Sequence, residues 1–125
     1  MTSWCPCGSG RNLDQCCGPI LDDPRRAETA EALMRSRYTA HTLGRWNHLW
    51  VTWHPRTRPE VIKDVPLQWT GLTIVDVAQR QPSDQYGVVE YIARHSEGIL
   101  HERARFEYRA RRWFYVCLLY TSDAA

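Results

Sequence analysis

Four cysteines near the N-terminus are the residues best suited to chemistry. Cys5, Cys7, Cys16 and Cys17 lie within thirteen residues of one another, whereas the fifth cysteine, Cys117, lies far along the chain. No apolar secretory segment precedes them, so we expect a reducing cytoplasm, in which thiols stay free to bind metal rather than forming disulfides. Four thiolates complete the tetrahedral shell of zinc and leave no position for a substrate. The pattern therefore predicts a structural zinc site.

Small residues around the cysteines fit a tight metal-binding loop. Gly8 and Gly10 let the backbone turn sharply, while Pro6 and Pro19 restrict it on either side. The string Cys-Pro-Cys-Gly-Ser-Gly, followed after five residues by Cys-Cys-Gly-Pro, resembles the SEC-C motif. That motif is a zinc-binding module also found at the C-terminus of the bacterial translocase motor SecA. The resemblance implies zinc as the cofactor.

Later segments resemble a family that carries this motif. Residues 30–38, 52–59, 69–72 and 100–106 are similar, in order and spacing, to successive segments of the YchJ family, small bacterial proteins of unassigned activity. That family joins the zinc motif to a domain similar to nuclear transport factor 2, a cone of helices on a curved antiparallel sheet. The resemblance implies an α+β fold with an N-terminal zinc knuckle.

The same resemblance divides the chain into three parts. We expect the SEC-C motif over residues 3–21, the nuclear transport factor 2-like domain over 25–117 and a tail over 118–125. The tail departs from the family pattern, so we expect it to lie outside the ancestral domain, with residues 122–125 disordered.

Hydrophobic periodicity gives a similar organisation from the residues alone. Apolar residues recur at helical spacing over 26–42, which predicts a helix that begins at Asp23 and is ended by Gly44. Tryptophans at helical spacing then predict a second, short helix that ends before Pro55. His41 falls on the apolar stripe of the first helix. β-branched and aromatic residues predict antiparallel strands over 67–77, 87–95, 99–109 and 112–119. Helices followed by such a sheet are typical of the α+β class.

Composition excludes several classes of protein. With 43% apolar and 24% charged residues, the 125-residue chain suits one globular domain. No apolar run reaches the ~18 residues that span a bilayer, which predicts a soluble cytoplasmic protein with no membrane partner. The formal net charge of +2 falls to zero once four thiolates hold one zinc ion. Overall charge therefore gives no argument for nucleic-acid binding.

Glu102 is the first candidate catalytic residue. It shares a face of the third predicted strand with Leu100 and Phe106, where a carboxylate is costly unless it is paired or lies in a wet cavity. In a cone this face lines the mouth, which makes Glu102 a candidate general base or ligand anchor with a raised pKa. The alternative is a structural ion pair with Arg37 or Arg58.

His54 is the candidate partner of Glu102 in an acid–base pair. It lies at the end of the second predicted helix, and histidine titrates near neutrality. The alternative is a histidine that caps the C-terminus of that helix. Arg58 is a candidate anion ligand, with an ion pair to an acid as its alternative.

Aromatic residues complete the candidate pocket. Tyr38, Trp53, Trp69 and Tyr91 could form walls around a planar ligand, although tryptophan at helical spacing is more often a core residue. Cys117 has no histidine partner near it in sequence, which argues against a catalytic thiol.

Arginines gather in the last predicted hairpin. Arg103, Arg105, Arg109, Arg111 and Arg112 could contact the phosphates of an RNA or of a ribosome, but such a strip is more often a solvated sheet face with cross-strand pairs. Any role in nucleic-acid binding is confined to this hairpin.

These observations favour a zinc-binding interaction or ligand-binding module of unassigned activity. The knuckle is a candidate docking site for a protein partner, a chaperone or the ribosome, as the resemblance to the SecA terminus implies. The alternative is a small-molecule enzyme that uses Glu102 and His54 in the cone. The sequence contains neither a glycine-rich phosphate loop of the P-loop or dinucleotide type nor a nucleophile elbow, so the substrate and the reaction stay open.

Overall fold

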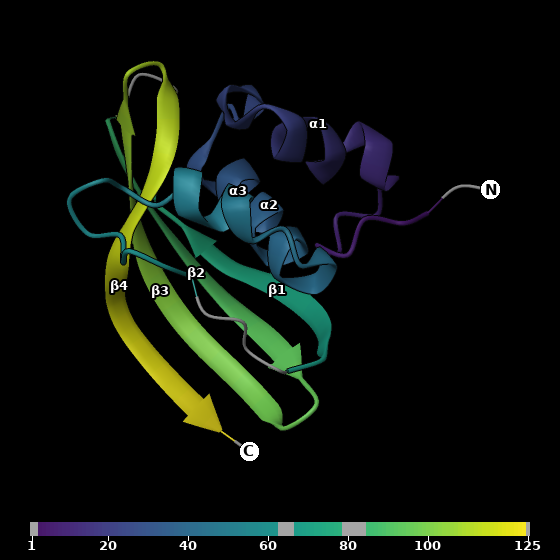
Figure 1. Ribbon diagram of the computed structural model, residues 1–125. Coiled ribbons are helices and arrows are strands. Elements are labelled where there is room, and N and C mark those ends of the chain that lie inside the picture. The colour runs from purple at the N-terminus through teal and green to yellow at the C-terminus, as the bar shows by residue number, and fades with distance from the viewer. Residues whose placement is uncertain (1–2, 63–66, 79–84, 125) are drawn as a thin grey trace.

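Helices come first in the chain, and a four-stranded antiparallel sheet follows (Figure 1). The structure is a computed structural model that describes residues 3–62, 67–78 and 85–124. The helical elements are η1 (Leu13–Gln15), α1 (Cys17–Asp22), η2 (Pro24–Arg26), α2 (Ala30–Leu43) and α3 (Trp46–Val51), where η marks a short 3-10 helix. The strands are β1 (Trp69–Val77), β2 (Tyr86–His95), β3 (Gly98–Arg109) and β4 (Arg112–Ala124), adjacent in chain order. The predicted α+β class is confirmed.

Capping residues fix both ends of helix α2. Oγ1 of Thr29 accepts a hydrogen bond from the N–H of Ala32 at 3.0 Å, and Gly44 has a φ of 70°, the left-handed conformation that ends many helices. The prediction that Asp23 starts this helix is wrong. Asp23 caps η2 instead, where its Oδ1 accepts from the N–H of Arg25 at 3.1 Å, and the chain is extended again before α2 begins.

Tight turns and bulges shape the sheet. Ala110 and Arg111 have φ values of 50° and 65°, the geometry of a two-residue hairpin turn between β3 and β4. The pairing register shifts twice between β1 and β2 and twice between β3 and β4. Such bulges bend strands and increase their twist. The sheet is therefore curved, and α2 packs against β1, β2 and β4 within the curve (Figure 1).

The apolar core lies between α2 and the sheet. Leu33, Val89, Phe106 and Trp113 come from α2, β2, β3 and β4, and each is at most 1% exposed. The indole N–H of Trp113 donates to the C=O of Glu28 at 3.3 Å, which ties β4 to the segment before α2. In the described ranges, no helix has the length and hydropathy needed to cross a bilayer.

Strand β4 runs further than the sequence predicted. The expectation that residues 122–125 are disordered is wrong for residues 122–124, because β4 continues to Ala124 and Ser122 pairs in register with His101. The physical reason is the length of β3, whose backbone N–H and C=O groups offer pairing partners along that whole edge. Residue 125 lies outside the described residues.

Gly87 provides a test of the packing between α2 and β2. A Cβ at Gly87 would lie 2.9 Å from the Cβ of Ala30 and 3.4 Å from Cζ3 of Trp113, closer than carbon atoms normally pack. We predict that Gly87→Ala lowers the free energy of unfolding by about 1–3 kcal/mol, measured by urea denaturation. The double variant Gly87→Ala/Ala30→Gly should recover part of this loss because it removes the nearest contact. Unchanged stability in Gly87→Ala would contradict the close approach.

Candidate functional site

The four N-terminal cysteines form one buried cluster. Their Sγ atoms all lie within 4.8 Å of one another, and each of the four residues is at most 8% exposed. The Sγ of Cys16 lies 3.6 Å from that of Cys7 and 4.0 Å from that of Cys17, too far for an S–S bond of about 2.05 Å. Four sulfurs at about 2.3 Å from a tetrahedral ion are separated by about 3.8 Å. The cluster therefore has the size needed to hold one metal ion.

The thiols interact strongly with one another. Hydrogen bonding between Cys5 and Cys17 lowers the pKa of the Cys5 thiol and raises the pKa of the Cys17 thiol, so the two groups share a proton rather than ionise independently. Cys117 lies on β4, is partly exposed, and does not belong to the cluster. Four cysteines are thus available as ligands, as the sequence predicted.

A tight turn and the start of α1 bring the cysteines together. The first pair lies on the turn, where the N–H of Cys5 donates to the C=O of Arg11 at 2.8 Å and the N–H of Gly8 donates to the C=O of Cys5 at 3.2 Å. Gly8 has a φ of 78°, and a Cβ there would lie 3.2 Å from the carbonyl oxygen of Leu72 on β1. Glycine is therefore favoured at this position both by the backbone conformation and by the close approach of the sheet.

Hydrogen-bond donors surround the sulfurs. The Sγ of Cys16 lies 3.2 Å from Oγ of Ser9 and 3.7 Å from Nη2 of Arg11, and the Sγ of Cys5 lies 3.7 Å from Oγ1 of Thr39 on α2. Such donors offset the negative charge that four thiolates leave around a divalent ion. The surroundings of the cluster thus suit a metal–thiolate centre.

The cluster is part of the protein core rather than a tethered module. Nη1 of Arg35 on α2 donates to the C=O of Cys7 at 2.8 Å, and its Nε donates to Oε2 of Glu31 at 2.9 Å. The cysteines share one continuous buried cluster with Leu33 of α2 and Leu72 of β1. A substitution of one of these cysteines would therefore also disturb the packing of α2 on the sheet.

A cavity of about 320 Å³ between α2 and the sheet, which we call the cone cavity, is the second candidate site. Its walls include Glu102 and all four of the predicted aromatic residues, Tyr38, Trp53, Trp69 and Tyr91. The volume is at the lower end of the range for small-molecule sites, and the lining is mainly aromatic and aliphatic. The structure therefore brings most of the predicted pocket together.

Arg37 on α2 carries a positive charge into this cavity. The residue is 7% exposed, and its Nη1 donates to the C=O of Leu49 at 2.9 Å and to Oγ1 of Thr52 at 2.7 Å. Its Cζ lies 4.5 Å from the ring centroid of Tyr115 and 5.4 Å from that of Trp53. No acidic partner is found for it among the described residues, and burial lowers its pKa to about 10. A buried guanidinium without an anion is unfavourable.

Glu102 on β3 lies in the same cavity without an arginine partner. Its Oε1 accepts a hydrogen bond from the hydroxyl of Tyr91 at 2.6 Å, and burial raises the pKa of the carboxyl. The predicted alternative, an ion pair with Arg37 or Arg58, is not found in the part of the chain that the structure describes. Arg37 and Glu102 both influence the pKa of Tyr115, which burial raises to about 12. The cavity therefore contains a guanidinium and a carboxyl group that do not pair with each other, and both act on Tyr115.

Two lining residues carry enclosed polar atoms without partners. Nδ1 of His41 and Nε1 of Trp53 have no hydrogen-bond partner among the described residues. Burial lowers the pKa of His41 to about 4, so its ring is neutral at pH 7. Neither Arg37 nor His41 was among the residues predicted to line the pocket. The sequence pattern that could have identified them is a pair of titratable side chains, four residues apart, on the apolar stripe of one helix.

His54 does not join Glu102 in an acid–base pair. Its Nδ1 accepts from the N–H of Arg56 at 3.1 Å, and its Nε2 lies 3.3 Å from Oε2 of Glu107 and 3.3 Å from Nη1 of Arg109. The ring is buried against Phe114, at a centroid distance of 5.8 Å. The helix-capping alternative also fails, since α3 ends at Val51 and Thr52 is its C-cap residue. His54 instead fixes the loop after α3 to the last two strands.

Arg58 likewise lies outside the cavity. Its Cζ lies 3.5 Å from the ring centroid of Trp50, and its backbone N–H donates to the C=O of His54 at 2.9 Å. It forms no ion pair with a described acid. His54 was predicted to enter the pocket from a helix end and Arg58 to bind an anion there, but neither residue lines the cavity.

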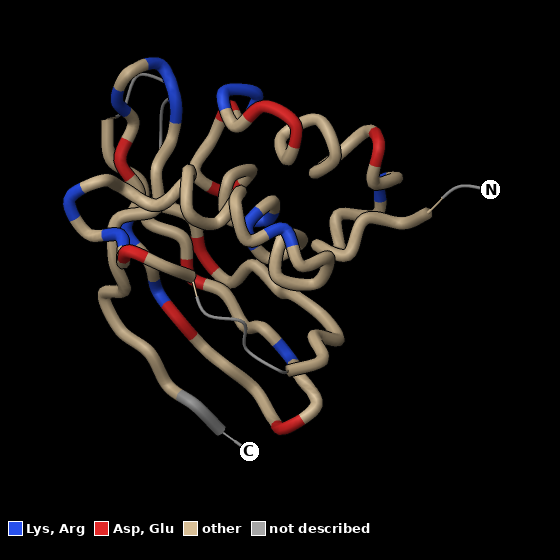
Figure 2. The backbone as a smooth tube through the Cα atoms, viewed as in Figure 1, with Lys and Arg blue, Asp and Glu red and all other residues tan. Residues whose placement is uncertain are grey.

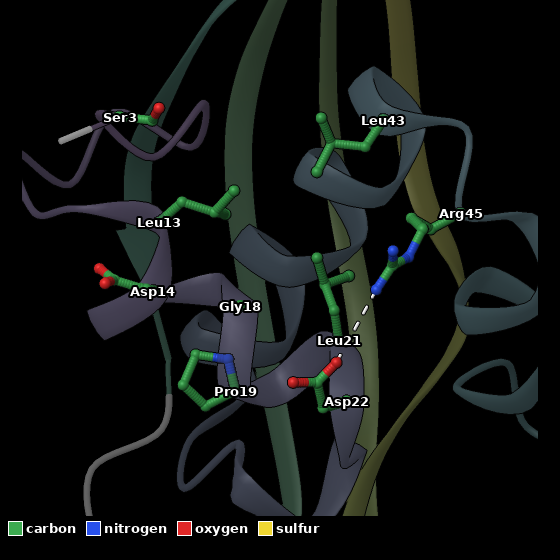
Figure 3. A pocket seen from close by; sticks show the side chains of 9 residues that line it. All are labelled: Ser3, Leu13, Asp14, Gly18, Pro19, Leu21, Asp22, Leu43 and Arg45. Atoms are coloured by element: carbon green, nitrogen blue, oxygen red, sulfur yellow. Dashed lines mark ion pairs between the residues drawn. The ribbon is translucent and has the colours of Figure 1, made fainter. Parts of the chain in front are cut away.

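A larger surface hollow lies beside the knuckle and shares no lining residue with the cavity between α2 and the sheet. It measures about 480 Å³ and is lined by leucines together with Asp22 and Arg45, whose Oδ1 and Nη2 atoms are 3.9 Å apart (Figure 3). These two side chains are 81% and 51% exposed, so the hollow does not desolvate them. It offers none of the buried polar groups that distinguish the cone cavity.

Comparison with known proteins agrees with this architecture. Residues 1–19 match the model of the SEC-C motif, and residues 29–117 match the model of the YchJ middle nuclear transport factor 2-like domain. A UPF0225 protein of Streptomyces coelicolor is 45% identical over 113 residues, covering 90% of this chain and 91% of that protein. A UPF0225 protein of Chromobacterium violaceum is 44% identical, covering 90% and 89%.

A solved structure has the same fold. The solution structure of a SEC-C motif-containing protein from Rhodopseudomonas palustris superposes with a TM-score of 0.81 at 32% identity, covering 97% of this chain and 98% of that one. The match spans both the cysteine knuckle and the helix-and-sheet domain.

Glu102 offers a test of the cavity's low polarity. Because burial raises its pKa, the folded state binds the proton more tightly than the unfolded state, and ionisation costs stability as the pH rises above the ordinary carboxyl range. We predict that Glu102→Gln is more stable than the wild-type protein at pH 7, and that the difference vanishes near pH 4, as measured by urea midpoints. The exposed Glu97→Gln should change little at either pH. An equal gain at both pH values would contradict a charge effect.

Proposed function

The chain belongs to the family that joins a SEC-C motif to a YchJ-type middle nuclear transport factor 2-like domain, and on this premise we propose that it is a zinc-stabilised module that binds a small organic acid. The four clustered cysteines hold the zinc, and the cavity under the sheet holds the ligand. The observation that carries this proposal is Arg37, a buried guanidinium that lines the cavity without an acidic partner among the described residues.

Zinc is the metal that the cluster fits best. Four thiolates form the closed tetrahedral shell of structural zinc sites, and burial of all four excludes water from the sulfurs. A complete shell has no open position for a substrate, so the metal stabilises the fold and takes no part in a reaction. The hydrogen bond from Arg35 to the C=O of Cys7 links the metal-binding loop to α2, so a bound metal would also stabilise that helix.

The unused donors of the cavity indicate the ligand. Nη1 of Arg37 is occupied by Leu49 and Thr52, but no partner for Nη2 or Nε is found among the described residues. Nε1 of Trp53 is also unpartnered, and the guanidinium lies over the rings of Trp53 and Tyr115. A carboxylate takes two parallel hydrogen bonds from guanidinium nitrogens, and aromatic walls favour a flat ligand. We therefore propose an aromatic or heteroaromatic carboxylic acid.

Glu102 in the same cavity favours a hydrogen-bond donor on the ligand. Oε1 of Glu102 accepts from the hydroxyl of Tyr91 and Oε2 accepts from that of Thr121 at 3.3 Å, and each carboxylate oxygen can accept a second hydrogen bond. A hydroxyl or amine on the ring, opposite the carboxylate, would meet this group. An enzyme that pairs Glu102 with His54 is not supported, since the two side chains lie in different hollows. Binding, rather than acid–base chemistry by that pair, is the function proposed.

The chemistry of the cluster also supports a cytoplasmic location. In an oxidising compartment, neighbouring thiols such as Cys7 and Cys16 would form disulfides in competition with metal binding. A thiolate centre is retained where thiols are kept reduced, which is the condition of the cytoplasm.

The zinc assignment can be tested by elemental analysis. We predict about one zinc per chain after purification under reducing conditions, complete loss of zinc in Cys7→Ser, and full retention in Cys117→Ser, because only the first is a ligand. Mass spectrometry on the same samples counts free thiols. A folded, metal-free protein with two disulfides would refute the zinc centre, and a different stoichiometric metal would refute its identity.

The ligand class can be tested with benzoate and its neutral counterpart benzamide. We predict that benzoate shifts the indole NMR signals of Trp53 and Trp69, with an affinity about tenfold above that of benzamide. The variant Arg37→Met should bind both compounds equally weakly. It should also stay folded, because it replaces an unpaired buried charge with an apolar side chain of similar length.

Arg58→Met is the matched control, because it removes an arginine outside the cavity. Its preference for benzoate should equal that of the wild-type protein. Equal binding of benzoate and benzamide to the wild-type protein would contradict the proposal. NMR shifts induced by benzoate only in the signals of surface arginines, and not in those of Trp53 and Trp69, would also contradict the proposal.

A further inference from the structure

One end of the molecule concentrates positive charge. Figure 2 shows Lys and Arg segments at the tip of the β3–β4 hairpin, at η2 and in the loop after α3, all toward the same end. Element η2 packs against β4, and the guanidinium charges of Arg25 and Arg58 act on Arg112. We call this group the arginine end; its members are Arg25, Arg26, Arg56, Arg58, Arg105, Arg109, Arg111 and Arg112.

Acids neutralise little of this charge. Arg25 pairs with Asp23 at 3.1 Å, and Glu107 lies against His54. No ion pair within 4.0 Å involves any of the other seven arginines of this end, as far as the described residues extend. Arg103 of the predicted strip does not belong here, because its Nη1 lies 3.0 Å from Asp76 and 2.9 Å from Glu90. The structure thus removes one arginine from that strip and adds others from η2 and the loop after α3.

The fold holds these like charges together despite their repulsion. Nη2 of Arg112 donates to the C=O of Val51 at 2.6 Å, and its Cζ lies 4.2 Å from the ring centroid of Phe114. Partial burial lowers the pKa of Arg112, and the nearby charges of Arg25 and Arg58 lower it further. The turn at Ala110 and Arg111 is tight, which sets the neighbouring arginines close together. An anion that bridges them would relieve this repulsion.

Aromatic rings accompany the arginines. The Cζ of Arg105 lies 4.6 Å from the ring centroid of Tyr86, which is 51% exposed, and Arg58 lies over Trp50. Tyr108, near the hairpin tip, is 39% exposed. Nucleobases stack on exposed aromatic rings and on guanidinium planes, whereas acidic peptides need only the charge. The combination favours a nucleic acid over an acidic protein.

We propose that the arginine end binds single-stranded nucleic acid, with arginines from the hairpin tip, η2 and the loop after α3 on successive phosphates and with bases stacked against Tyr86. None of these arginines lines the cone cavity, and Arg56, Arg105 and Tyr86 line a separate, smaller hollow of about 250 Å³. The proposal is independent of the cavity and of the zinc centre, because it uses neither Arg37 nor a cysteine.

The test is fluorescence anisotropy with a labelled 15-nucleotide poly(U) strand at several salt concentrations. Arg109→Gln/Arg111→Gln should weaken binding at least tenfold. It should also reduce the slope of log affinity against log salt by about 1.4, since each phosphate contact to a single strand contributes about 0.7. The matched control is Arg45→Gln/Arg94→Gln, which removes the same net charge from elsewhere and should change neither quantity.

Two further arms separate stacking and partner class. Tyr86→Leu should weaken binding severalfold without changing the salt slope, because it removes a ring and no charge. A poly-glutamate peptide of the same length should bind at least tenfold more weakly than poly(U). Equal losses in the two double variants, equal affinity for poly-glutamate, or no binding to the wild-type protein at 50 mM salt would each overturn the proposal.

Discussion

Burial of helix α2 between the curved sheet and the cysteine cluster determines how the other parts of the molecule are arranged. One side of the helix carries Leu33 into the core, and Arg35 and Thr39 reach the knuckle. Because the same helix also carries Arg37 and His41 into the cone cavity, the metal centre and the candidate ligand site share one rigid support. A metal ion held by these cysteines would therefore also support the geometry of the cavity.

The cavity also shows how a fold can keep an unfavourable group. Arg37 is buried with hydrogen bonds to Leu49 and Thr52 but without a described carboxylate, although Glu102 lines the same space. An ion pair between the two would have neutralised the cavity and closed it to a charged ligand. Holding them apart leaves a polarised space whose electrostatic cost an anionic ligand would offset.

Much of the fold followed from the sequence because its signals are local. The strands were predicted from the alternation of apolar and polar residues and from β-branched residues. The hairpin at Ala110 and Arg111 was predicted from the short gap between two of these strands. Helix α2 was predicted with the wrong start because Asp23 and Thr29 are both good capping residues, and the choice between them depends on how the chain packs after η2. The length of β4 depended on its neighbour β3, which no local pattern in residues 118–124 reveals.

By itself, the sequence determined the cysteine cluster, since four cysteines spaced C-x-C and C-C within one short segment can come together after only local folding. It also determined that Glu102 faces inward, because alternation along a strand fixes the side. Only the tertiary structure decided which residues share the cavity. His54 lies next to Trp53 in sequence yet packs against Glu107, whereas Arg37 and His41 enter the cavity from another element. Proximity between elements depends on how helices and strands pack, and local spacing carries no information about that distance.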